Sequence, residues 1–332
     1  MEFLEILWLG KPAWMWLAFL GLVATLLVLD LGVFHRKDRV ISARESIAMS
    51  AFYITLGLAY GGFVWWQLGQ GAAIDYVTGF VIEKSLAMDN VFVIAMIFSY
   101  FAVPAQYQHR VLFWGILGVI ILRAIMIGLG SALVSQFGWV LYIFAAFLIF
   151  TGVKMWLSAE KQYDPASNPV LKLLRRRLPV TDELHGHNFF AKVPSSPGAA
   201  ATWHATPLFL ALLMVEIVDV VFAVDSVPAI FAITTDPFIV YTSNIFAILG
   251  LRALYFALAA LVDRFHYLKY ALAVLLVFIG SKIFVADALG LAKIPPLMSL
   301  GITLAILAAG VGFSLWKTRG AGGAAPPTPA RT

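Results

Sequence analysis

Two acidic stretches lie inside apolar runs that are long enough to cross a lipid bilayer. The first is EKSLAMDNV at 83–91, and the second is DVVFAVDSV at 219–227. A carboxylate in the hydrocarbon region is energetically costly, so acids there usually pair with other groups or bind ions. Carboxylate and amide oxygens are preferred by hard cations such as Mg²⁺, Ca²⁺ and Mn²⁺, whereas Zn²⁺ and copper favour His or Cys. The two stretches therefore predict a site for a divalent cation.

The predicted ligands are oxygen-bearing side chains on these stretches and on neighbouring apolar runs. They are Glu83, Asp89, Asn90, Glu216, Asp219, Asp225, Ser226 and Asn244. On a straight helix Glu83 and Asn90 share a face, while Asp89 stands about 120° away from Glu83. The acids of one helix therefore need partners from elsewhere, or a break near Asn90 or Pro228.

Depth along the two helices predicts which acids meet. If the helices run in opposite directions, equal depth pairs Glu83 with Asp225 and Asp89 with Asp219. Glu216 is expected to join the level that holds Asp219, because it lies three residues earlier on the same face.

Two basic residues near the middle of apolar runs, Arg123 and Arg252, are predicted counter-ions for the acids. They could hold the empty site neutral until a cation displaces them, or they could form purely structural ion pairs. Asp30, near the cytoplasmic end of the first run, is either a metal ligand in an entrance on the cytoplasmic side or a partner of Arg36 or Arg39.

Composition explains why these acids can be buried. Hydrophobic residues make up 61% and charged residues 12% of the chain, and the mean hydropathy is +0.90. Soluble domains are about 45–50% apolar and about 25% charged, so the composition predicts a polytopic membrane protein. The formal net charge of +5 comes mostly from residues between apolar runs, which argues against a nucleic-acid partner. The absence of Cys excludes disulfides, thiolate metal ligands and Cys nucleophiles.

Apolar runs of bilayer length, each about 20 residues or more, predict an all-α transmembrane bundle of about nine helices. They lie at roughly 14–33, 47–68, 74–102, 111–135, 138–157, 205–233, 238–262, 268–289 and 295–316. The basic stretch FHRKDRV follows the first run and is expected in the cytoplasm by the positive-inside rule. The prediction is a multi-pass protein of the bacterial inner membrane, with its N-terminus outside and its C-terminus inside.

The chain also contains a repeat. The acidic stretches align with each other, GILG at 115–118 aligns with AILG at 247–250, and YIFAAFLIFTGVKMW at 142–156 aligns with YALAVLLVFIGSKIF at 270–284. Three matches in the same order predict two three-helix repeats. An odd number of helices makes the repeats inverted, as in secondary transporters, whose substrate sites lie near the midplane.

The expected division of the chain follows from the repeats and the loops. It consists of an N-terminal two-helix segment at 1–72, a first repeat at 73–157, a cytoplasmic loop at 158–204, a second repeat at 205–289, a last transmembrane helix at 290–316 and a disordered tail at 317–332.

The chain resembles the TerC family and, within it, the Alx-like manganese exporters. The resemblance rests on LVLDLGVFHRK, EKSLAMDNVFV, YQHRVLFWGILG, LPVTDELHG, EIVDVVFAVDSVPAIFAITTDPFIVYTSNIFAILGLRALYF and HYLKYALAVLLVFIG. Such proteins are similar in architecture to the LysE superfamily. The resemblance implies Mn²⁺ efflux through the acidic motifs, that is, through Glu83, Asp89, Glu216, Asp219 and Asp225.

The expected function is therefore a secondary transporter that exports Mn²⁺ in exchange for protons. Moving a cation out against an inside-negative potential costs about 2.3 kcal/mol per charge per 100 mV. Buried carboxyl groups can supply the coupling, because they release protons when a metal binds. The expected partners are the metal ion, protons and the lipid bilayer, with no resident cofactor.

Three alternatives are weighed against export. Uptake would use the same site, and a membrane scaffold would assist the metallation or assembly of exported proteins. An intramembrane hydrolase is disfavoured because the GxGD and HExxH strings are missing from the sequence, so the protein is not expected to be an enzyme.

Overall fold

The structure is a computed structural model that describes residues 2–32, 42–158, 164–165, 168–194, 201–258, 267–290 and 294–318. Nearly all of the long elements are helices. They are α1 (Ala13–Gly32), α2 (Ala43–Tyr100), α3 (Ala105–Gln136), α4 (Val140–Leu157), α5 (Pro169–Arg177), α6 (Pro207–Phe231), α7 (Pro237–Leu249), α8 (Leu251–Leu258), α9 (Leu268–Ala288) and α10 (Pro296–Thr318). The remaining elements are a 3-10 helix η1 (Glu2–Glu5) and two antiparallel strand pairs, β1 (Leu7–Trp8) with β2 (Lys11–Pro12) and β3 (Phe190–Pro194) with β4 (Ala201–Ala205).

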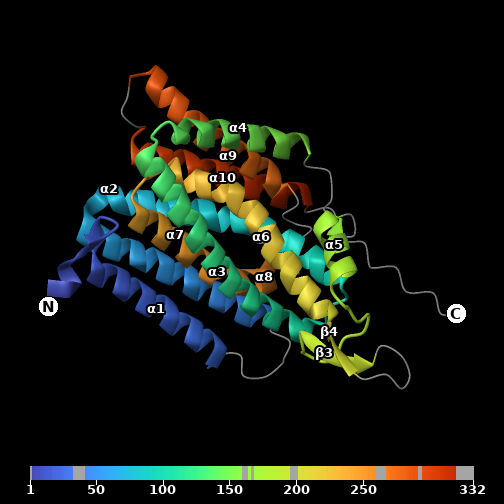
Figure 1. The fold of residues 1–332 in the computed structure, drawn as a ribbon. Coiled ribbons are helices and arrows are strands. Elements are labelled where there is room, and N and C mark those ends of the chain that lie inside the picture. The colour runs from blue at the N-terminus through green and yellow to red at the C-terminus, as the bar shows by residue number, and fades with distance from the viewer. Residues whose placement is uncertain are drawn as a thin grey trace.

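The long helices lie side by side in one slanted bundle, with α5 and the β3–β4 hairpin at one end (Figure 1). Within the described residues, six helices are long and apolar enough to cross a membrane, and a seventh span results if α7 and α8 are joined. The chain is thus a helical, multi-pass membrane protein, as its composition predicts.

The helix α2 is 58 residues long, and non-helical backbone at Gly69 (φ 86°, ψ 175°) divides it. In a straight helix residues 57 and 76 would lie about 28 Å apart along the axis. The Tyr76 hydroxyl nevertheless donates to the Gly57 carbonyl at 2.9 Å. The helix therefore folds back at Gly69, where a positive φ favours glycine, into two antiparallel limbs that appear blue and cyan in Figure 1.

Each predicted apolar run coincides with an element of the structure. The two limbs of α2 correspond to the second and third runs, the α7–α8 pair corresponds to the run at 238–262, and every other run matches one helix. The apolar part of α1, Ala13–Leu29, is shorter than the spans counted above. That all nine segments cross a bilayer stays a prediction.

Side-chain caps and prolines mark the start of several of these helices. The Ser42 side chain accepts a hydrogen bond from the Glu45 amide at the start of α2, and Asp236 accepts from the Phe238 amide at the start of α7. Such caps satisfy amides that have no partner inside the helix. Proline opens α5, α6 and α7, where its missing amide costs nothing.

Three connections between helices meet at one end of the bundle. A cavity of about 270 Å³ there is lined by Gly138, Thr235 and Pro296. Gly138 lies between α3 and α4, Thr235 lies between α6 and α7, and Pro296 begins α10. Asp75 and Asp287 also line this cavity. We call it the vestibule. The three loops therefore share one side, although which face of the membrane that side meets stays a prediction.

The α4 and α9 helices pack closely against each other, and their contact is reciprocal. A Cβ atom added to Gly152 would lie 2.7 Å from the Ala273 carbonyl oxygen, and one added to Gly280 would lie 2.5 Å from the Ala145 carbonyl oxygen. Gly152 and Gly280 are aligned in the sequence repeat, as are Ala145 and Ala273. Each helix thus uses the same two positions against the backbone of the other.

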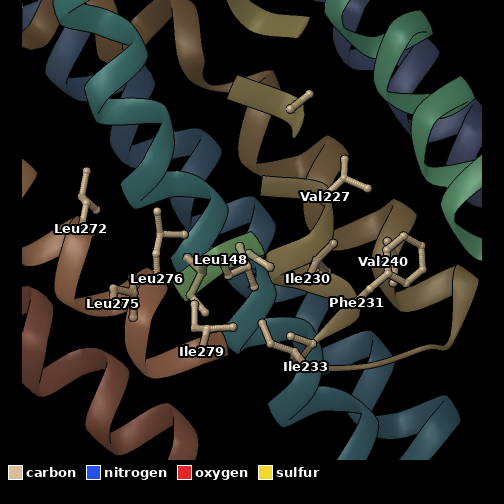
Figure 2. Close-up of a cluster of buried hydrophobic side chains, with 14 of the residues drawn as sticks. Leu148, Val227, Ile230, Phe231, Ile233, Val240, Leu272, Leu275, Leu276 and Ile279 are labelled. Atoms are coloured by element: carbon tan, nitrogen blue, oxygen red, sulfur yellow. The ribbon is translucent and has the colours of Figure 1, made fainter. Parts of the chain in front are cut away.

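A large apolar cluster joins α4, α6, α7 and α9 (Figure 2). Along α9 the cluster runs from Leu268 through Leu276 to Ile279, and on α6 it includes Phe231. Buried apolar side chains in a protein interior are closely packed, so this region is tightly packed. Further along α9, after Ile279, Lys282 lines the vestibule.

Candidate functional site

The centre of the bundle holds a buried guanidinium between two carboxylates. Arg123 on α3 is 1% exposed. Its Nη1 pairs closely with Glu83 on the second limb of α2, and its Nη2 lies 3.4 Å from Oδ1 of Asp219 on α6. Both carboxylates are themselves buried. Three helices therefore contribute one charge each to a buried cluster.

Two neutral side chains complete the coordination of Arg123. Its Nη1 donates to Ser226 Oγ at 2.9 Å and to Asn244 Oδ1 at 3.2 Å. Asn244 in turn donates from Nδ2 to Glu83 Oε2 at 3.0 Å. Charge-assisted hydrogen bonds of this kind are stronger than neutral ones. We call Glu83, Asp219, Ser226, Asn244 and Arg123 the arginine cluster.

Contacts between α3 and α7 hold Arg123 against Asn244. The Tyr241 hydroxyl of α7 donates to the carbonyl of Ala124 at 2.6 Å. Ala124 directly follows Arg123, and Asn244 lies three residues after Tyr241, nearly one turn along α7. This bond therefore fixes the register in which the guanidinium meets the amide.

Asp89 and Asp225 lie together at a separate position. They line one small cavity of about 40 Å³, together with Asn90, Ser226 and the wall formed by Arg123. Leu272 and Leu276 of the apolar cluster close the same cavity. We call it the acid cavity. The volume is enough for one or two water-sized groups.

Asn90 connects the two groups of acids. It is 4% exposed, and its Oδ1 has no hydrogen-bond partner. It lines the acid cavity and also a smaller space of about 10 Å³ beside Asp219. An acceptor that is buried without a donor is costly, so this oxygen is available for a cation or water.

Glu216 stands beside Asp219 of the arginine cluster. Its Oε2 is buried without a hydrogen-bond partner. The carboxylate packs against α3 at Gly118, where an added Cβ would lie 2.0 Å from Oε1. Glycine at 118 thus leaves the space that this carboxylate fills.

Lys84 supports a broken helix with a hydrogen bond to its backbone. Its Nζ donates to the Ala247 carbonyl at 3.0 Å, in the last turn of α7. α7 and α8 meet at Gly250 with a bend of 40°, and a Cβ there would lie 2.6 Å from Lys84 Nζ. A cation at a helix C-terminus is favourable because the exposed carbonyls carry partial negative charge.

One expectation from the sequence was wrong. The pairing by depth fails, because Arg123 bridges Glu83 and Asp219 while Asp89 shares its cavity with Asp225. The depth argument considered the acids alone, whereas a guanidinium between two carboxylates offsets their repulsion. Of the two alternatives for bringing the acids together, the structure shows partners from other helices and no break near Asn90 or Pro228: α2 and α6 stay helical there, and a bend lies at Gly250. Pro228 lies in the last turn of α6, which ends at Phe231.

The other predicted residues are placed as follows. Arg252 is buried in α8, and its role as a counter-ion stays a prediction. Asp30 belongs to α1, but its side chain lies outside the described residues, as do Arg36 and Arg39. Within the described part of the chain, no three His, Asp or Glu side chains are arranged to hold a metal ion. The acids occur as two pairs, with the guanidinium at one of them.

The sequence pattern did not indicate that polar neighbours of Asp225 come from α4. Thr151 and Lys154 are the polar groups beside Asp225. Lys154 is aligned with Lys282 in the repeat, but its place near a helix end indicated an interfacial lysine. A threonine three residues before it, in an otherwise apolar run, was the available signal.

Comparison with known proteins agrees with the resemblance seen in the sequence. The integral membrane protein TerC family matches residues 68–321. An uncharacterized membrane protein of Myxococcus xanthus is 47% identical over 93% of this chain and 94% of its own length, and one of Rickettsia bellii is 46% identical over 89% and 95%. Alx of Escherichia coli strain K12, whose name describes a proposed membrane-bound redox modulator, is 48% identical over 90% of this chain and 92% of its own. No solved structure matches the chain.

Proposed function

The chain belongs to the TerC family of integral membrane proteins, and from that premise we propose that it is a secondary transporter that exports divalent cations, Mn²⁺ first among them. The observation that carries the proposal is the gathering of buried carboxylates from α2 and α6 at the centre of the bundle. Intramembrane acids that face a bundle interior typically mark an ion pathway. Their oxygen chemistry suits Mn²⁺.

The proposed architecture is a pair of inverted three-helix repeats. The reciprocal contact of Gly152 and Gly280 supports it, because aligned residues meet each other's equivalents across α4 and α9. A two-fold axis between the helices produces this pattern. The bent α7–α8 pair beside the site adds a discontinuous helix, which is common around the ion sites of such transporters.

A route follows from the order of features along α9. Leu272 and Leu276 line the acid cavity, Ile279 belongs to the apolar cluster, and Asp287 lines the vestibule. Along α9, apolar residues that include Ile279 (Figure 2) thus lie between those that line the acid cavity and those that line the vestibule. We infer that the cluster is the barrier on the vestibule side, and that transport requires it to open.

Proton exchange is the coupling that we propose. A carboxyl group must lose its proton before it ligates a metal, so metal binding releases protons. Outward export of a divalent ion against an inside-negative potential needs such an energy source. The relative's name points to redox chemistry, but this sequence contains no cysteine thiol for disulfide exchange.

The test is transport by the purified protein in sealed vesicles. An Mn²⁺-sensitive dye and a pH-sensitive dye are read in the same vesicles under opposite imposed pH gradients. We expect Mn²⁺ movement that requires the protein and is accompanied by opposite proton movement. A folded protein that moves no divalent cation under either gradient would favour the scaffold alternative. In intact cells, the direction of net Mn²⁺ movement under an imposed pH gradient separates export from uptake.

A further inference from the structure

We propose that Arg123 is a tethered substitute for the transported cation. In the empty carrier its guanidinium pairs with the carboxylates of Glu83 and Asp219. A divalent cation must displace the guanidinium to bind these carboxylates. The inference rests on the proposed function and adds the identity of the group with which the metal competes.

The contacts of Arg123 coincide with a cation's ligand set. Its donors meet a carboxylate on α2, a carboxylate and a hydroxyl on α6, and an amide oxygen on α7. A guanidinium carries donors only, and each of its partners here presents an acceptor oxygen. Hard divalent cations take the same oxygen types from side chains. A metal placed on these oxygens would therefore have to replace the arginine.

The balance of charge favours a divalent competitor. Two ionised carboxylates and one guanidinium leave a single negative charge in a buried cluster. A divalent cation on the same carboxylates would neutralise them completely, and the displaced guanidinium would pair with Asp89 or Asp225, which line the acid cavity together with Arg123. A monovalent cation would do no better than Arg123. Because an uncompensated buried charge is costly, competition with Arg123 discriminates against monovalent ions. This gives the residue a role in selectivity and not only in stability.

The position of Arg123 also places it between the two pairs of acids. It forms part of the wall of the acid cavity, which Asp89 and Asp225 line. A cation in that cavity has Arg123 between itself and the oxygens of Glu83 and Asp219. Movement of the guanidinium is therefore the step that would connect the two pairs.

The experiment compares Mn²⁺ binding by the purified wild type, Arg123→Gln and Arg123→Lys. Binding is measured by calorimetry and by the Mn²⁺-dependent rise in melting temperature. We expect Arg123→Gln to melt lower without metal, to bind Mn²⁺ at least tenfold more tightly, and to exchange it more slowly in vesicles. Arg123→Lys should lie between the two, because it keeps a cation but loses the planar donor set. Arg110→Gln, on the same helix beside Phe189, should leave Mn²⁺ affinity unchanged.

A gain of affinity is not what structural damage alone produces, so it separates the two roles. If Arg123→Gln does not fold, Asp219→Asn and the double variant Arg123→Gln/Asp219→Asn give the same comparison, with the double variant expected to bind Mn²⁺ more tightly. Unchanged or weaker Mn²⁺ affinity without the arginine, in a protein whose wild type transports Mn²⁺, would overturn this inference and leave the proposed function standing. A folded wild type that neither binds nor transports Mn²⁺ would overturn both.

Discussion

The chemistry of individual residues depends on which oxygens a cation can reach. Arg123 already holds Glu83 and Asp219. Asp89 and Asp225 instead line a cavity, and Asn90 adds an acceptor that has no donor. We expect a cation to meet this second pair of acids before it meets the first.

The first prediction concerns the two cavity acids. Asp89→Asn and Asp225→Asn should each abolish Mn²⁺ transport and leave the protein inserted and folded, because the amide keeps the shape and removes the charge. Transport is measured in vesicles, and folding by gel filtration and melting. Asp182→Asn is the matched control, since Asp182 is exposed in the loop between α5 and β3. Wild-type flux by either cavity variant would contradict the proposed site.

The second prediction uses the space beside Glu216. Gly118→Ala should impair Mn²⁺ transport as strongly as Glu216→Gln, because a Cβ at 118 would lie 2.0 Å from the carboxylate and must displace it. Gly115→Ala is the control on the same helix, where the nearest atom is an ordinary 3.4 Å away. Normal transport by Gly118→Ala alongside loss by Glu216→Gln would show that the carboxylate works from another position.

Residue types were easier to predict than residue partners. An acid inside an apolar run is visible in the sequence because its burial needs a reason. The partners of Glu83 and Asp225 depend on how α2, α3 and α6 cross, and a linear pattern does not contain that information. Helical periodicity did separate Asp89 from Glu83, and in the structure these two side chains face different neighbours.

At the scale of helices, the α4–α9 pair offers a direct test of the repeat. Gly152→Ala and Gly280→Ala should each destabilise the protein by about 1–3 kcal/mol, as overpacking does in cores, and should do so to a similar degree. The reason is that each new Cβ meets a backbone carbonyl of the other helix, which cannot rotate away. Melting temperature and Mn²⁺ flux are the measurements. Gly301→Ala, which has open space around it, should be neutral.

Unequal effects would argue against the two-fold relation between the helices. A loss at Gly152 with none at Gly280, for example, would mean that the two contacts only look alike.

Helix positions follow from the sequence more fully than helix breaks do. Apolar runs marked the membrane-length helices, and the polar gap after residue 68 marked the fold-back at Gly69. The break at Gly250 was missed because ILGLRAL reads as continuous helix. Lys84, which is distant in sequence, donates to the Ala247 carbonyl beside this break.

For the whole molecule, the expected orientation has the N-terminus outside and the C-terminus in the cytoplasm. The strongly basic loops then face the cytoplasm, and the vestibule faces outward. Reporter fusions at Met1 and Thr332 that are active only on one side of the membrane give the measurement. Termini on the same side would require an even number of crossings and would contradict the inverted repeat.

The contact of Gly152 and Gly280 also bears on how such a chain could arise. Because each helix offers the other the same pair of positions, the two surfaces are in effect one surface used twice. A half-length ancestor that inserted into the membrane in both orientations could make this contact with its own copy. Gene duplication and fusion would then have fixed one copy in each orientation and freed them to diverge, as Glu216 and its counterpart Phe80 have done.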